Sequence, residues 1–141
     1  MKNISMAREW LKASVIDLKV IKEIITNKDL SSMTAFHSQQ SIEKSLKSVL
    51  EYYGEEVPKI HQIKKLFNLT SKYILFDIDM EIILKIDTLY IDSRYPGDMG
   101  LLPYGKPTLN DAEEFYDFAL MIFDKVCILL KIDKSELISN D

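Results

Sequence analysis

The chain has 141 residues, 47% hydrophobic and 28% charged, which is ordinary for one soluble globular domain. Its 22 acidic and 18 basic residues give a formal net charge of −4, which argues against a protein whose main task is coating nucleic acid. The single cysteine excludes an intrachain disulfide and a cysteine-based metal site, so a reducing cytoplasm is the simplest setting. No apolar run approaches the ~20 residues that a membrane span needs.

The apolar residues recur at helical spacings and seldom alternate with polar ones, which predicts an all-α fold. The first predicted helix covers residues 5–26. Asp17 lies inside its apolar stripe, where an unpaired carboxylate would be costly. Two interpretations stay open: Asp17 forms a salt bridge that locks the first helix to the second, or it orients a basic group of a site. His37 and Lys44 are candidate partners in both.

The second predicted helix, residues 31–54, has two chemically different faces. The apolar face is made by residues at spacings of three, four and seven, namely Ala35, Ile42, Leu46, Val49, Leu50 and Tyr53. The nearly opposite face carries His37, Gln40, Lys44 and Lys47 and no carboxylate. An imidazole, an amide and two ammonium groups on one face can bind an anion or donate hydrogen bonds. We therefore expect this face to be the leading functional surface.

A third, shorter helix is predicted to start near Pro58 and to end at Thr70. His61 lies in its predicted first turn, where either a structural or a catalytic role is open. Residues 73–79 read as an irregular link, although their Ile and Phe content would also permit a strand. A fourth helix is predicted over residues 80–93.

The only long predicted loop follows, over residues 94–107, and it contains three of the four Pro and three of the four Gly. Loops of this length are often functional. Thr108 is placed to cap a last helix that runs to residue 130. Residues 133–141 read as a polar, frayed tail. These patterns predict one domain, residues 1–132, folded as an up-and-down bundle of about five helices.

Several common site motifs are absent from the sequence. There is no Gly-rich phosphate loop, and no His or Cys pair has the spacing of a metal site. We therefore expect no metal and no cofactor, while a nucleotide ligand remains open.

Four short motifs follow one another in order from about residue 5 to residue 130. They are Trp10, Ala13 and Asp17-Leu18; Phe36-His37-Ser38-Gln39-Gln40 with Glu43-Lys44 and Leu46-Lys47; Pro58 to His61; and Arg94-Tyr95-Pro96. Together they resemble the HEPN domain, and in particular minimal stand-alone HEPN proteins. The resemblance implies an α-helical bundle that commonly dimerises. It also implies frequent pairing with a small nucleotidyltransferase of the MNT type.

The resemblance also bears on catalysis, because many HEPN relatives are RNases of toxin–antitoxin, defence or RNA-processing systems. Their catalytic signature is an Arg followed a few residues later by a His. Arg94 matches the Arg, but no His follows it anywhere in the chain. Tyr104 loosely matches the tyrosine that receives a nucleotide in some HEPN–MNT pairs.

Three functions therefore stay open. The first is a non-catalytic module that binds a nucleotide or phosphate ligand, or a nucleotidyltransferase partner, within a toxin–antitoxin or defence pair. Its candidate binding residues are His37, Gln40, Lys44, Lys47, Arg94 and Tyr95. The second is a metal-independent RNase in which Arg94 works with His37 or His61. The third is a structural homodimer of helical bundles, in which Asp17 neutralises Lys44.

Overall fold

The computed structural model of the chain describes residues 2–92 and 106–138, with the side chains of residues 90–92 left aside. The described residues form five α-helices and two short 3-10 helices, and they contain no strand. The elements are α1 (Ile4–Ile24), η1 (Lys28–Leu30), α2 (Ser31–Tyr52), α3 (Ile63–Thr70), α4 (Met80–Asp92), α5 (Leu109–Leu130) and η2 (Lys134–Glu136). The prediction of an all-α helical bundle is confirmed.

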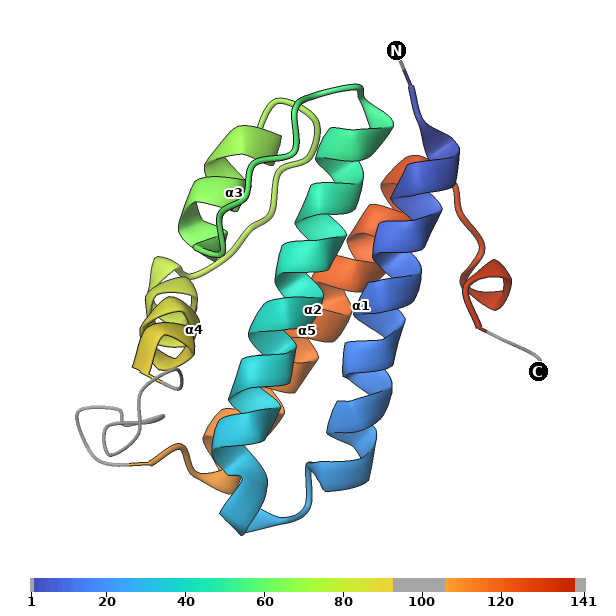
Figure 1. The fold of residues 1–141 in the computed structure, drawn as a ribbon. Coiled ribbons are helices and arrows are strands. Elements are labelled where there is room, and N and C mark those ends of the chain that lie inside the picture. The colour runs from blue at the N-terminus through green and yellow to red at the C-terminus, as the bar shows by residue number, and fades with distance from the viewer. Residues whose placement is uncertain (1, 93–105, 139–141) are drawn as a thin grey trace.

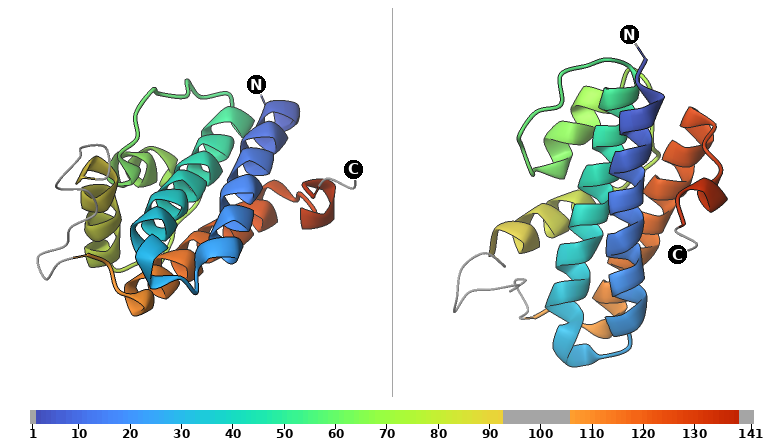
Figure 2. Two further views of the ribbon diagram at one scale, coloured as in Figure 1. Left: turned by 60° about the horizontal axis from the view of Figure 1, so that its bottom comes forward. Right: turned by 45° about the vertical axis from the view of Figure 1, so that its right-hand side comes forward.

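The helix α2 is the centre of the bundle, because it contacts each of the other four α-helices. The long helices α1 and α5 lie beside it, and the shorter α3 and α4 pack on the other side of α2 from α1 (Figure 1). The two further views show the same order, with α1 and α2 antiparallel along most of their length (Figure 2). The predicted apolar face of α2 forms much of the core, where Ile42, Leu46 and Val49 are fully buried.

Small polar side chains lie where α1 and α2 cross. Ser14 Oγ is 2.7 Å from Ser41 Oγ and 3.0 Å from Ser45 Oγ, and it also donates to the Ser41 carbonyl at 3.0 Å. All three serines are fully buried. Their small size lets the two helices pack closely, and the hydrogen bonds satisfy hydroxyl groups that burial would otherwise leave unpaired.

The start of α3 differs from the sequence prediction. The helix begins at Ile63 and not near Pro58, so His61 lies in the segment before the helix. The cause is a carboxylate from another helix: Asp87 of α4 accepts hydrogen bonds from the backbone N–H of Ile63 at 2.8 Å and of Lys64 at 3.1 Å. These bonds satisfy the free amides at the helix start, as an N-cap does. Local sequence patterns cannot predict a cap that another helix supplies.

The segment after α5 also differs from its prediction. Lys131 ends α5 in the left-handed conformation (φ 56°), and the chain turns back toward α1. Leu137 then packs into the core, and Glu136 forms an ion pair with Arg8 of α1 at 3.2 Å. The expectation of a frayed tail is therefore wrong for residues 133–137. Leu137 and two ion pairs, Glu136 with Arg8 and Lys134 with Asp124, hold this segment on the bundle.

Cys127 of α5 is buried in the core. Burial raises the pKa of its thiol to about 11, so the group stays protonated and unreactive at neutral pH.

None of the helices in the described ranges combines the length and the apolar character that crossing a membrane requires.

Candidate functional site

The polar face of α2 meets a buried carboxylate from α1. Asp17 is 5% exposed, and its two oxygens face two different partners on α2. His37 Nδ1 lies 2.9 Å from Asp17 Oδ1, and Lys44 Nζ donates to Asp17 Oδ2 at 2.7 Å. His37 and Lys44 stand two turns apart on α2 and so share one face. Asp17 thus bridges the two residues that the sequence suggested as its partners.

A second carboxylate, Glu43, organises the neighbouring part of α2. Lys47 Nζ donates to Glu43 Oε2 at 3.1 Å, and His61 Nδ1 lies 2.9 Å from Glu43 Oε1. Gln39 donates to the backbone carbonyl of His61 and so holds the segment before α3 against α2. We call the residues Asp17, His37, Gln39, Gln40, Glu43, Lys44, Lys47 and His61 the polar seam.

Lys47 does not lie on an exposed surface, contrary to the prediction from the sequence. Its side chain is 6% exposed, and its ammonium lies 5.6 Å from the centre of the Trp10 ring. A buried ammonium group must be paired, and Glu43, one turn earlier on the same helix, supplies the partner. Lys47 therefore belongs to the interior, because Trp10 of α1 and the Glu43–His61 pair lie beside a part of α2 that helical periodicity alone marks as exposed.

The accessible edge of the polar seam consists of four side chains. His37 is 21% exposed, Lys44 25% and His61 50%, and Gln40 is half-buried between the positions of His37 and Lys44. Gln40 donates to the side-chain oxygen of Gln39 at 2.8 Å. We call His37, Gln40, Lys44 and His61 the seam edge. The structure thus brings together three of the predicted α2 residues and adds His61 to them.

The charges of the polar seam cancel. Asp17 faces Lys44, Glu43 faces Lys47, and the two histidines each share one of these carboxylates. The two carboxylates therefore balance the two ammonium groups of the seam. The sequence prediction of a cationic face missed Glu43, although its spacing of one turn from Lys47 was a signal for an ion pair. The pairing of Asp17 with Lys44, by contrast, depends on how α1 packs on α2.

The histidines of the seam are held by their carboxylates in defined orientations. The Nδ1 atoms of His37 and His61 lie against Asp17 and Glu43, and the ring of His37 also packs edge-on to Phe36 with centroids 5.4 Å apart. For His37, the carboxylate at Nδ1 fixes the ring and leaves its Nε2 side for another contact. In the described part of the chain, no residue forms a hydrogen bond with Nε2 of His37.

Three other predicted site residues lie outside the described residues. Arg94 and Tyr95, named as ligand-binding residues, and Tyr104, the candidate for nucleotide transfer, all fall in the segment 93–105. Among the described residues, no group of three or more His, Cys, Asp or Glu side chains is placed to hold a metal ion.

The family model of the HEPN domain matches residues 7–131, which is most of the chain. The chain belongs to the HEPN domain family. This HEPN domain is also similar to a crystal structure of ST0689, an archaeal HEPN homologue, with a TM-score of 0.61 and 24% identity. The match covers 88% of this chain and 97% of that chain, and at this identity it concerns the fold alone. None of the curated proteins compared with the chain matches it.

The HEPN motifs of this sequence have a common structural basis. The motif residues Asp17, His37, Gln39, Glu43 and Lys44 are all members of the polar seam, and His61 joins them from the segment before α3. The motif thus describes how α1, α2 and the approach to α3 are held together around two buried carboxylates. The side chains of these motif residues form hydrogen bonds and ion pairs with one another.

Proposed function

We propose that this HEPN protein is a non-catalytic binding module of the cytoplasm whose seam edge recognises a partner protein. One observation carries the proposal: both lysines of the polar seam are already paired with buried carboxylates. A phosphate site needs excess positive charge or many unpaired donors. An edge with two imidazoles, an amide and an ammonium that is already paired is better suited to hydrogen bonds with another protein surface.

The resemblance to stand-alone HEPN proteins supports one partner class. Because HEPN proteins resembling this one pair with nucleotidyltransferases of the MNT type, we take such an enzyme as the partner, within a toxin–antitoxin or defence pair. The accessible side of His37 and the side chain of Gln40 are the groups that we expect to contact it. Both can donate and accept hydrogen bonds, which suits a polar contact that must also exclude the wrong partner.

The test is assembly in solution. The protein is co-expressed with an MNT-type nucleotidyltransferase, and the complex is measured by size-exclusion chromatography with light scattering. We expect a complex that the double variant His37→Ala/Gln40→Ala weakens, while Lys125→Ala, a change of an exposed lysine on α5, leaves it intact. No complex, or a complex that the double variant leaves unchanged, would contradict the proposal.

Nucleotide binding is the second candidate, because Lys44 is partly exposed next to the accessible side of His37. It predicts that ATP raises the melting temperature and that Lys44→Ala abolishes the shift. Our proposal expects no shift that depends on Lys44. Thermal unfolding with and without ATP distinguishes the two, and Lys125→Ala again serves as the control.

RNA cleavage is tested separately, since the carboxylate-held imidazoles of His37 and His61 have the arrangement of oriented general bases. The non-catalytic proposal expects RNA to stay intact at high protein concentration, with and without divalent metal. Cleavage by the purified protein that disappears in Arg94→Ala would overturn it.

A further inference from the structure

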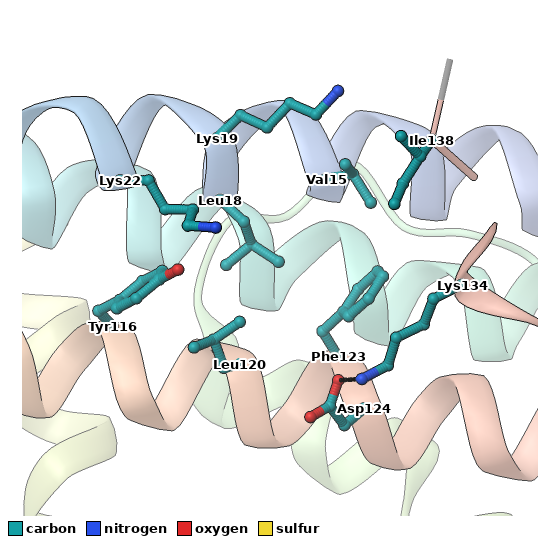
Figure 3. Close-up of a pocket in the computed structure, with 10 residues that line it drawn as sticks. All are labelled: Val15, Leu18, Lys19, Lys22, Tyr116, Leu120, Phe123, Asp124, Lys134 and Ile138. Carbon is teal, nitrogen blue, oxygen red and sulfur yellow. Dashed lines mark ion pairs between the residues drawn. The ribbon is translucent and has the colours of Figure 1, made fainter. Parts of the chain in front are cut away.

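A groove of about 300 Å³ runs between α1 and α5, on the side of α1 that faces away from the polar seam. Its floor is apolar and includes the buried side chains of Leu18 and Phe123, and its walls include the half-buried Val15 and Leu120 (Figure 3). Ile138, after η2, closes one end. None of these side chains belongs to the seam, so the groove is a separate feature of the molecule.

The groove follows from how the helices pack. α1 packs more extensively on α2 than on α5, so its α5-facing stripe is only partly covered. Val15, Leu18 and Lys22 recur at spacings of three and four on α1, and Tyr116, Leu120 and Phe123 do the same on α5. These two stripes face each other across the groove (Figure 3). Apolar side chains that face each other without filling the space between them leave room for an apolar guest.

The two ends of the groove differ in charge. At one end Lys134 forms an ion pair with Asp124, so that end is neutral. At the other end Lys22 extends toward the hydroxyl group of Tyr116 (Figure 3). Among the described residues, Lys22 forms no ion pair, and Tyr116 forms no hydrogen bond through its hydroxyl group. Burial, with a smaller effect of Asp117, raises the pKa of the Tyr116 phenol, so this hydroxyl remains a donor.

We propose that the groove binds a small amphipathic carboxylate, such as a medium-chain fatty acid. The apolar chain would lie on Leu18, Leu120 and Phe123, and the carboxylate would accept hydrogen bonds from Lys22 and from the Tyr116 hydroxyl group. Charge complementarity decides for this ligand class: the floor is apolar, one end is neutral, and the other end presents an unpaired ammonium and a phenol. The volume is at the lower end of the range for small-molecule sites, which fits a ligand of this size.

The experiment is calorimetric titration with decanoate below its micellar concentration, with decanol as the uncharged analogue. We expect decanoate to bind more tightly than decanol by about threefold to tenfold, the effect of a partly exposed ion pair with a hydrogen bond. Lys22→Ala and Tyr116→Phe should each bring decanoate closer to decanol. Lys125→Ala is the control, because Lys125 is an exposed lysine of α5 that does not line the groove.

A second variant tests the apolar floor. Leu120→Trp fills the groove, and we expect it to abolish decanoate binding while circular dichroism shows an unchanged helix content. His37→Ala, in the polar seam, should leave decanoate binding unchanged, so a failure of the seam proposal is separable from a failure here. Equal affinity for decanoate and decanol that is insensitive to Lys22→Ala would overturn the inference. So would the absence of binding at ~1 mM decanoate, where weak ligands are still detectable.

Discussion

The two sides of α1 meet their neighbours in opposite ways. Toward α2, polar and charged side chains are buried and paired, with Asp17 bridging His37 and Lys44. Toward α5, the side chains are mostly apolar and leave a groove, and Lys22 at its rim has no partner among the described residues. The polar side of α1 therefore packs closely against its neighbour, whereas the apolar side borders a groove.

This difference shows why a charged face in a sequence does not by itself identify a binding surface. A buried charge must be paired, since its desolvation costs several kcal/mol, so evolution places a carboxylate beside each ammonium in the polar seam. A lysine at a solvent-exposed rim needs no partner and stays available. The groups that are available to bind a ligand are therefore the charged side chains that have no ion-pair partner in the fold.

The largest effect that we predict comes from the most buried pair of the seam. Glu43→Ala removes the partner of Lys47, whose side chain is 6% exposed. We expect it to lower the free energy of unfolding by about 3–5 kcal/mol, the cost of an unpaired buried charge. Urea unfolding measures this. Replacing both residues, as Glu43→Met/Lys47→Met, should restore most of the loss, and a loss below ~1 kcal/mol for the single variant would mean that Lys47 reaches water.

A smaller effect is expected at the more accessible pair. Asp17→Ala leaves His37 and Lys44 without their carboxylate, but both are partly exposed and can turn toward water. We expect a loss of about 1–3 kcal/mol in the free energy of unfolding. Lys44→Met should cost less, since Asp17 then keeps its contact with His37. If the order of Asp17→Ala and Glu43→Ala were reversed in urea unfolding, the assignment of Glu43–Lys47 as the more buried ion pair would be wrong.

Asp87 is another buried carboxylate, and its hydrogen-bond partners are backbone amides rather than charged side chains. Burial, the largest cause, and the nearby Glu43 raise its pKa, against the opposing hydrogen bonds from Ile63 and Lys64. Because the folded pKa is above the unfolded value of 3.8, the folded state holds this proton more tightly. The contribution of Asp87 to stability is therefore largest below pH 3.8 and falls as the pH rises through its folded pKa.

Asp87→Asn cannot ionise, and its side-chain oxygen can still accept a hydrogen bond at the start of α3. We expect the difference in the free energy of unfolding between this variant and the natural sequence to shift in favour of the variant as the pH rises through that window. Chemical unfolding at a series of pH values measures the difference. Asp87→Ala, which also removes the cap, should cost about 1 kcal/mol at neutral pH. A difference that is independent of pH would contradict the raised pKa.

The smallest effect is expected at the groove. Lys22 is exposed and unpaired among the described residues, so Lys22→Ala should change the free energy of unfolding by no more than about 0.5 kcal/mol. Urea unfolding provides the measurement. A loss of the size expected for Asp17→Ala would show that Lys22 has a structural partner, and the contrast between the two sides of α1 would then disappear.

Helical periodicity, read from the sequence alone, located α1, α2, α4 and α5 to within a few residues, and Thr108 marked the cap that the structure has at the start of α5. These features depend on residues three or four positions apart, so the local pattern contains the information. The HEPN motifs likewise identified the family, because the seam residues that form them lie in short stretches of α1 and α2.

The tertiary structure decided the features that depend on contacts between distant segments. Asp87 of α4 sets the start of α3, the surrounding helices bury Lys47, and Leu137 fastens the segment after α5 onto the core. The groove exists only because α1 packs on α2 more extensively than on α5. Burial and pairing are properties of the assembled bundle. Residues far apart in the chain determine them together, and so the spacing of residues within one helix does not reveal them.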